Sequence, residues 1–288
     1  KENIAKMVNG QASNVALMSN SSEAISMITN SLQLDPGDNI IINNLEFPSG
    51  VLPNLLHKEK GVEVRVVEHK KWEVSVEDIL EQVDDRTKLV ITSHVSYLSG
   101  ARIDYKTLYE KLSETNAIML LDVTQSLGAV PVDVQYTDLL VCSSYKWLLS
   151  THGVGILVMN DNRKVNLNPR YIGWRSISDM FRDDRFENFT FHDDARKFEL
   201  GYPSYPTIYS LNYSTRLLLT IGANKIEGHI LSLGEELINR LKSINIQVMT
   251  PEDGKNRAGN ISFTCKNGEK MSEILEQENV YAWGGDGR

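Results

Sequence analysis

The residues with the clearest capacity for chemistry are Asp122 and Lys146, each of which follows an apolar stretch. Asp122 closes the run Ala-Ile-Met-Leu-Leu-Asp, and Lys146 follows the run Asp-Leu-Leu-Val-Cys-Ser-Ser-Tyr. If both runs are strands of an open α/β sheet, the two side chains lie at its carboxyl edge, where such sheets bind ligands. An amine nucleophile beside a carboxylate suits a pyridoxal phosphate site, with Lys146 as the Schiff base and Asp122 on the pyridinium nitrogen. The alternatives are a helix-capping Asp and a solvated surface Lys.

Small polar residues supply the hydrogen-bond donors that a phosphate group needs. The stretch Ser19–Ile25 joins a predicted strand to a predicted helix and holds Ser21 and Ser22 at the helix start. Backbone amides and two hydroxyls at such a place form a phosphate cradle, although a plain helix N-cap is the alternative. Ser143 and Tyr145, close to Lys146 in the chain, add a second set of donors.

Apolar runs rich in Val, Ile and Leu alternate with amphipathic stretches along the first part of the chain. This alternation predicts an α/β fold with a mostly parallel, buried sheet. Helix starts are expected at Asp104 and at Ser75, which can cap the stretches that follow them. The expected strands are Val15–Ser19, Asn39–Asn43, Glu63–Val67, Leu89–His94, Ala117–Asp122, Leu139–Ser143 and Gly155–Val158.

The second part of the chain predicts long helices and a smaller α+β unit. Period-3.6 patterns after Pro206 and through residues 230–241 indicate two helices, followed by short strands in Ile244–Cys265 and a helix over Lys270–Gln277. We therefore expect a large domain over residues 1–222 and a small C-terminal domain over 223–288. Residues 166–197 are polar and aromatic, which is typical of a long loop over a site or interface.

The two ends of the sequence also carry information. The first ten residues have the character of a helix interior, and the last five form a glycine-rich turn with nothing after it to pack against. We expect the sequence to be a piece of a longer chain, with an N-terminal segment missing and the small domain truncated.

Three stretches together resemble the class V aminotransferase family of fold-type I pyridoxal phosphate enzymes: Leu121–Gly128, Ser143–Leu148 and Gly153–Gly155. That family includes cysteine desulfurases, selenocysteine lyase, kynureninase and isopenicillin N epimerase-like proteins. The resemblance extends over the whole sequence and depends chiefly on an Asp-x-x-Gln and a Ser-x-x-Lys motif. It implies a fold-type I large domain, pyridoxal 5'-phosphate as cofactor, and a homodimer whose sites are shared between subunits.

The resemblance implies a role for each residue that matches the family's motifs. Lys146 is the Schiff-base lysine, Asp122 pairs with the pyridine nitrogen, and Gln125 hydrogen-bonds the ring hydroxyl. Phe47 stands where desulfurases place a ring-stacking His, a bare core Phe being the alternative. His94 matches the family's Asn or His beside the cofactor, and a structural histidine is its alternative. The implied phosphate ligands are Ser21, Ser22, Ser143 and Tyr145.

The sequence departs from the family's pattern at several positions. Tyr145 replaces the His that precedes the lysine in desulfurases, and residues 279–286 lack the mobile-loop cysteine of desulfurases and selenocysteine lyase. The first departure points away from desulfurases, and the second argues against a cysteine-persulfide mechanism. Tyr202 replaces a Thr that reaches the phosphate of the neighbouring subunit. Arg175 is either a substrate-carboxylate contact or a surface or interface arginine, and the family's own carboxylate-binding arginine lies beyond Arg288.

Composition excludes several other classes of protein. The 288 residues carry a net charge of −8, with 30 Lys and Arg against 38 Asp and Glu, which gives no electrostatic footprint for nucleic acid or an anionic membrane. No apolar run approaches the roughly 20 residues that span a bilayer. Cys142 and Cys265 are too few for a disulfide framework or a zinc site, fit a cytoplasmic location, and are predicted to be packing residues, so no metal is expected.

The resemblance, together with Lys146 and Asp122, implies an enzyme that acts on an amino acid by aminotransferase-like or Cβ-eliminating lyase chemistry. The Tyr-Lys-Trp-Leu stretch resembles the epimerase-like branch, so amino-acid epimerisation is the next alternative. A non-catalytic binding protein with the same fold is a rival from another class. A nucleotide-binding α/β protein is a third, although the sequence has neither a Gly-x-Gly-x-x-Gly turn nor a Walker loop.

Overall fold

The protein is described here by a computed structural model covering residues 1–161, 165–285 and 287–288. Its strands are β1 (Val15–Met18), β2 (Asn39–Asn43), β3 (Glu63–Val67), β4 (Thr87–Ser93), β5 (Ile118–Asp122), β6 (Leu139–Ser143) and β7 (Gly155–Met159). The α-helices are α1 (Glu2–Met7), α2 (Ser21–Ser31), α3 (Pro48–Leu55), α4 (Val76–Leu80), α5 (Tyr105–Leu112), α6 (Tyr205–Ile221), α7 (Ala223–Ser243) and α8 (Gly268–Gln277). The predicted strand bounds differ from these by at most two residues.

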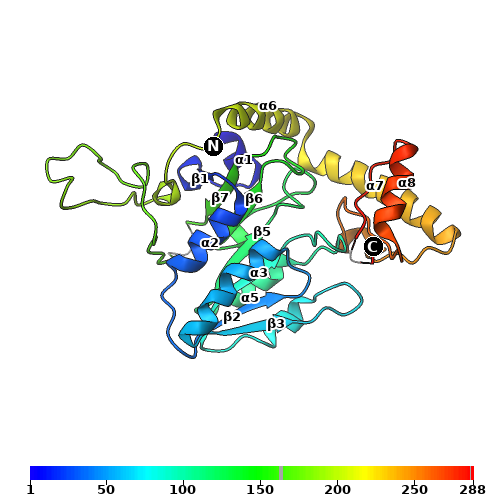
Figure 1. Cartoon of the computed structure of the whole chain (residues 1–288), viewed down its shortest axis with the longest axis horizontal. Coiled ribbons are helices and arrows are strands. Elements are labelled where there is room, and N and C mark those ends of the chain that lie inside the picture. Colours follow the sequence, from blue (N-terminus) through cyan, green and yellow to red (C-terminus); the bar gives the residue numbers. More distant parts are fainter. Residues whose placement is uncertain (162–164, 286) are drawn as a thin grey trace.

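The described strands form one sheet in the order β1-β7-β6-β5-β4-β2-β3 (Figure 1). β2 to β6 pair in parallel, and β7 runs antiparallel to both of its neighbours, β1 and β6. The expected α/β fold with a mostly parallel central sheet is therefore confirmed. Because the strand order steps along the sheet from β6 to β4, the carboxyl ends of three parallel strands lie side by side.

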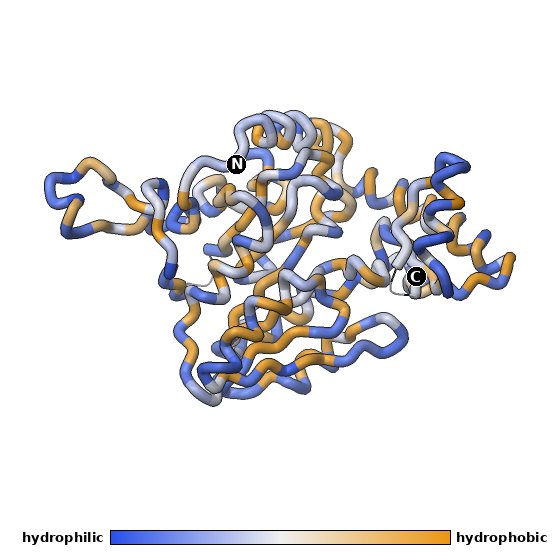
Figure 2. Tube along the Cα trace, in the orientation of Figure 1, coloured by the Kyte–Doolittle hydropathy of each residue, from blue (hydrophilic) through white to orange (hydrophobic). Residues whose placement is uncertain are grey.

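The pleat of the strands divides the core into two clusters, one on each face of the sheet. On β5, Met119 and Leu121 pack with α5 on one face, whereas Leu120 packs with α2 on the other. Figure 2 shows the sheet as the apolar centre of the molecule, with polar segments at its periphery. Successive side chains of a strand point to opposite faces, so the same alternation decides where the last side chain of each strand points.

The helix starts that position the candidate site are capped by their own side chains. The Asn20 side chain accepts a hydrogen bond from the Glu23 amide at 2.8 Å, and the Glu23 carboxylate accepts one from the Ser19 amide at 3.2 Å. These two hydrogen bonds fix Ser21 and Ser22 in the first turn of α2. The predicted caps at Asp104 and Ser75 are also confirmed, on α5 and α4 respectively.

The helices α7 and α8 lie beside the sheet, and the long loop over residues 166–197 projects at the opposite side (Figure 1). The prediction of short strands in Ile244–Cys265 is wrong in extent, because the pairing there is a single antiparallel bridge between Val248 and Phe263. Part of this segment pairs elsewhere, since Arg257 forms a bridge with Ala101 in the loop that follows β4. The division into two domains at residue 222 stays a prediction, and it falls between α6 and α7.

Gly155 is the point at which β7 passes closest to the start of α2. It pairs with Met18 on one side and with Ser143 on the other. A Cβ atom at this position would lie 2.2 Å from the carbonyl carbon of Asn20 and 2.6 Å from the amide nitrogen of Ser21. Both atoms belong to the backbone, so they cannot move aside without displacing the first turn of α2.

We expect Gly155→Ala to lower the free energy of unfolding by about 1–3 kcal/mol, the usual cost of overpacking a closely packed position. Urea denaturation followed by circular dichroism measures this difference. The matched control is Gly228→Ala in α7, where a Cβ would meet no atom within 4 Å. Replacing a helical Gly by Ala there is expected to stabilise the protein by roughly 0.5–1 kcal/mol. Equal effects of the two substitutions would contradict the close approach at Gly155.

Candidate active site

A cavity of about 120 Å³ opens at the carboxyl edge of β4, β5 and β6. Eight of the nine predicted site residues line it: Ser21, Ser22, Phe47, Asp122, Gln125, Ser143, Tyr145 and Lys146. Residues that the sequence reasoning missed complete the lining: Ser49, Ser93, Val95, Tyr97 and Thr124. The strand-end rule that selected Asp122 also applies to Ser93, which closes β4. Tyr97 lies in the loop after β4 and carries no comparable signal in the sequence.

Hydroxyl groups gather where α2 begins. The Ser21 and Ser143 hydroxyl oxygens lie 2.6 Å apart, and so do those of Ser22 and Ser49. These pairs join the first turn of α2 to the end of β6 and to the start of α3. The free amides and the dipole of a helix N-terminus favour an anion, and hydroxyls can turn to donate to it. This end of the cavity therefore has the chemistry of a phosphate site.

Asp122 places a partly buried carboxylate on the same face of the sheet. Its Oδ1 accepts a hydrogen bond from the Thr124 amide at 2.8 Å. Burial raises the pKa of Asp122 above its ordinary value, and the hydrogen bond from Thr124 opposes that rise. A carboxylate in this setting is stabilised by a cationic donor. The protonated nitrogen of a pyridine ring is such a donor.

Lys146 and two aromatic rings bound the more exposed part of the cavity. The Lys146 side chain is exposed, and its Nζ lies 5.5 Å from the centre of the Tyr145 ring. Tyr145 stacks on His152 with ring centres 3.9 Å apart. Phe47 is half-exposed and packs edge-on against Tyr97 at 5.2 Å. The amine, the anion site and the buried carboxylate thus surround one space.

His94 is the predicted site residue that the structure does not bring to this cavity. It follows Ser93, and the pleat therefore turns it to the opposite face of the sheet. There its ring packs edge-on against Tyr105 at 4.6 Å, and its Nε2 accepts a hydrogen bond from Arg102 at 3.1 Å. Burial lowers the pKa of His94 well below its ordinary value, with the positive charge of Arg102 adding to the effect. The expectation of a cofactor contact at His94 is corrected to that of a buried structural histidine.

Other predicted side chains lie outside the cavity. Arg175 pairs with the buried Glu199 carboxylate at 2.7 Å and stacks on Tyr202, so it serves the loop rather than the cavity wall. Cys142 is fully buried in the core, where burial raises the pKa of its thiol, and Cys265 is partly buried away from the cavity lining. Within the described ranges, no cluster of three or more His, Cys, Asp or Glu is arranged to hold a metal ion.

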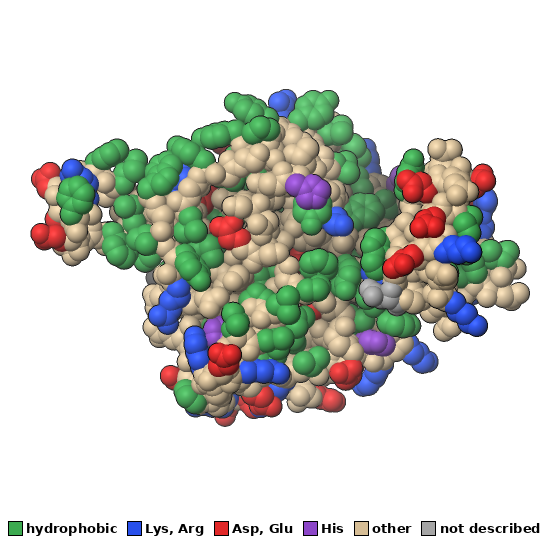
Figure 3. Space-filling view, in the orientation of Figure 1, with side chains coloured by type: hydrophobic (Ala, Val, Ile, Leu, Met, Phe, Trp, Pro, Cys, Tyr) green, Lys and Arg blue, Asp and Glu red, His purple; other side chains and the backbone are tan. Residues whose placement is uncertain are grey.

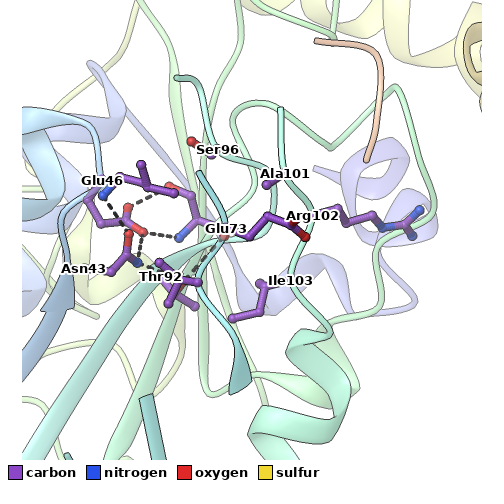
Figure 4. A pocket seen from close by; sticks show the side chains of 11 residues that line it. Asn43, Glu46, Glu73, Thr92, Ser96, Ala101, Arg102 and Ile103 are labelled. Atoms are coloured by element: carbon purple, nitrogen blue, oxygen red, sulfur yellow. Dashed lines mark hydrogen bonds between the residues drawn. The ribbon is translucent and has the colours of Figure 1, made fainter. Parts of the chain in front are cut away.

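A second, smaller cavity of about 40 Å³ adjoins the first across Ser93 and contains Glu46 (Figure 4). The Glu46 carboxylate accepts hydrogen bonds from the Asn43 side chain and from the Ser93 amide, both at 2.7 Å. The Ser93 hydroxyl donates a further bond at 2.6 Å. Burial raises the pKa of Glu46 to about 7, and the negative charge of Asp122 acts in the same direction, whereas the three hydrogen bonds oppose it.

Solved structures share this fold. A cysteine desulfurase from Thermococcus onnurineus superposes with a TM-score of 0.85 at 22% identity, covering 97% of this chain and 71% of that one. A cystine C–S lyase superposes with a TM-score of 0.86 at 20% identity, covering 97% and 76%. These likenesses place the chain in the fold of type I pyridoxal phosphate enzymes. Of the helices that the structure describes, none has the length and apolar character to cross a membrane.

The chain belongs to the aminotransferase class-V family, whose model matches residues 1–286. A probable cysteine desulfurase of Methanothermobacter thermautotrophicus is 30% identical over 284 residues, which cover 96% of this chain and 69% of the relative. An uncharacterized aminotransferase of Schizosaccharomyces pombe is 26% identical over 289 residues, covering 98% and 73%. A further uncharacterized protein of the same yeast is 26% identical over 257 residues, covering 87% of this chain and 59% of the relative.

Membership in this family makes the protein a pyridoxal-phosphate-dependent enzyme, a transferase or a lyase. The cavity fits that cofactor on its own chemistry. Its hydroxyls and helix N-terminus suit the phosphate, its buried carboxylate suits a protonated ring nitrogen, and Lys146 supplies the amine.

The raised pKa of Glu46 predicts a measurable pH dependence of stability. The folded chain binds more protons than the unfolded chain between the ordinary value of 4.5 and about 7. The free energy of unfolding therefore falls as the pH rises through that window. Glu46→Gln removes the titration and keeps an acceptor for Asn43 and for the Ser93 amide. We expect Glu46→Gln to raise the free energy of unfolding, relative to the wild type, by about 2 kcal/mol more at pH 8 than at pH 5.

Urea unfolding of the wild type and of Glu46→Gln at pH 5 and pH 8 gives this difference. The control is Glu114→Gln, since Glu114 lies exposed in the turn after α5. It should alter stability by the same small amount at both pH values. A stabilisation by Glu46→Gln that does not grow with pH would refute the raised pKa of Glu46.

Proposed function

We propose that the protein acts on an amino acid and holds pyridoxal phosphate covalently through Lys146. The observation that carries this proposal is the single cavity in which Lys146 and Asp122 face the hydroxyl groups at the start of α2. An amine alone or an anion site alone has many uses. The combination of an amine, a buried carboxylate and an anion cradle supports this cofactor specifically.

Each residue of the cavity has a distinct task in this proposal. When bound, the cofactor supplies an electron sink for bonds at the substrate Cα. Ser21, Ser22 and Ser143 bind its phosphate, with Tyr145 beside them. Asp122 keeps the ring nitrogen protonated, and its burial strengthens that interaction because little water competes. Lys146 would hold the cofactor, and its amine, once free, would take the proton from the substrate Cα as general base and return it as general acid.

The reaction that we favour is elimination of a group from Cβ, with aminotransfer as the alternative. The names of the relatives support this choice, since several are called probable cysteine desulfurase and one structural neighbour is a cystine C–S lyase. With cysteine as substrate, elimination breaks the Cα–H and Cβ–S bonds. Sulfide leaves, and hydrolysis of the remaining enamine gives pyruvate and ammonia. Such a reaction needs no acceptor cysteine, which agrees with the absence of one in residues 279–286.

We further propose that two copies of the chain associate through α6 and the neighbouring loop. Tyr205, Tyr209 and Tyr213 recur every four residues along α6 and are 50%, 74% and 76% exposed. Figure 3 shows hydrophobic side chains gathered over α6 and along the loop at the left. Exposed aromatic patches of this kind mark protein interfaces. We call these three tyrosines the α6 stripe. Tyr202 lies next to it and packs edge-on against Trp174, with ring centres 4.9 Å apart.

The covalent role of Lys146 predicts a visible absorption band in the protein reconstituted with excess pyridoxal phosphate. Borohydride should bleach the band and fix the cofactor to the peptide that contains Lys146, as mass spectrometry would show. Lys146→Ala should lack both the bleachable band and the labelled peptide. Lys111→Ala, at an exposed lysine of α5, is the matched control and should behave as wild type.

The same preparation separates the candidate reactions. Elimination predicts pyruvate, ammonia and sulfide from cysteine, whereas aminotransfer predicts a keto acid in an amount equal to the aminated cofactor, and epimerisation predicts only loss of optical activity. Wild-type protein that forms no band with excess cofactor would defeat the enzyme proposal in favour of a non-catalytic binding protein.

The dimer proposal predicts that negative charge on the α6 stripe separates the subunits. Sedimentation of the wild type should give twice the mass of the chain, and Tyr209→Asp with Tyr213→Asp should give the monomer mass, because two carboxylates cannot be buried unpaired. Asn239→Asp, at an exposed position of α7, adds the same charge elsewhere and should leave the dimer intact. A monomeric wild type, or a dimer that survives the double substitution, counts against α6 as the interface.

A further inference from the structure

The side-chain amide of Gln125 is held from behind by two donors. Its Oε1 accepts a hydrogen bond from the indole Nε1 of Trp147 at 3.3 Å and another from Nδ2 of Asn260 at 3.2 Å. An indole N–H can only donate. The amide atom that faces Trp147 must therefore be the oxygen, and the Gln125 nitrogen is left to point elsewhere. Because Gln125 lines the cavity, its N–H group is available to the ligand there.

Both donors depend on a contact between segments far apart in the chain. Asn260 follows Gly259, and a Cβ at Gly259 would lie 2.3 Å from Cη2 of Trp147. The six-membered ring of the indole thus packs closely against the backbone at Gly259. Oδ1 of Asn260 is buried and has no hydrogen-bond partner among the described residues, so the contribution of Asn260 here is its Nδ2 donor.

We infer that Trp147 and Asn260 are positioning residues that fix the Gln125 amide with its N–H group toward the cofactor. This inference rests on the proposed function, because it concerns the same cofactor in the same cavity. A fixed N–H donor stabilises a negative charge on the ring oxygen that it faces, whereas an amide free to rotate would present donor and acceptor alternately. The contact between residues 258–260 and Trp147 therefore affects the cofactor through the orientation of the Gln125 side-chain amide.

The experiment follows the pH titration of the visible band of the reconstituted full chain, together with the dissociation constant of pyridoxal phosphate. Trp147→Phe keeps a ring against Gly259 and removes the N–H, and Asn260→Ala removes the second donor. With both changes the amide is unrestrained. We expect the midpoint of the titration to rise by about one pH unit and the dissociation constant to rise about tenfold, as loss of a hydrogen bond to a charged group implies.

The single variants provide a sharper test than the double. Either remaining donor still holds the oxygen, so each single change should shift the midpoint by less than half of the double shift. Gln125→Glu keeps an acceptor for both Trp147 and Asn260 and turns an oxygen toward the ring. It should raise the midpoint at least as far as the double variant does, and it does so without removing any packing.

Matched controls are Trp72→Phe and Asn256→Ala. Trp72 stacks on His69 away from the cavity, and Asn256 is exposed in the segment that precedes Gly259. Both should titrate as wild type. A double variant or Gln125→Glu that titrates as wild type would overturn the inference while Lys146→Ala still abolishes the band, so the proposed function would stand. A wild type without a band would overturn both.

Discussion

The site depends on the pleat of three neighbouring parallel strands. β4, β5 and β6 pair in register so that Ser93 lies opposite Asp122, and Asp122 lies opposite Val141. Side chains at every second position of these strands face α2. The last residue of each strand therefore adds a polar group to the same face at the same edge. A register shift of one residue in any of these strands would move its last, polar side chain to the other face of the sheet, into the apolar core there.

The same geometry explains why the start of α2 meets the strand ends so closely. The chain leaves β1, forms the N-cap at Asn20 and enters α2, where its backbone passes close to Gly155 of β7. Only a glycine at position 155 leaves room for that backbone. The Ser21 hydroxyl can then reach that of Ser143, at the end of β6. The anion cradle and the buried carboxylate thus come from separate sequence motifs that one close approach brings together.

Much of this arrangement follows from the sequence, and what does not has a physical cause. The alternation of apolar runs with amphipathic stretches predicts the strands, and strand ends predict Asp122, Ser143 and Lys146. The rule fails for His94 because β4 ends one residue earlier, at Ser93. The Ser93 side chain therefore faces the cavity, and the His94 side chain faces the opposite side of the sheet. The strand-end rule cannot predict Tyr97 and Asn260, because both residues lie in loops. Asn260 lies 135 residues from Gln125, and no local pattern records such a contact.

Burial of charge is the remaining constraint on the site. Glu46 is buried and Asp122 is partly buried on the same side of the sheet, and the Ser93 hydroxyl donates a hydrogen bond to Glu46. Desolvation disfavours both charges, and their mutual repulsion adds to that effect. Three hydrogen bonds from Asn43 and Ser93 compensate the Glu46 carboxylate, whereas the Asp122 carboxylate accepts a hydrogen bond from Thr124. The imbalance leaves Asp122 as the carboxylate that gains most from a cationic ligand. Glu46, by contrast, ties the turn that carries Phe47 to the end of β4. The Glu46 carboxylate thus stabilises the fold, whereas the Asp122 carboxylate is available to the cofactor.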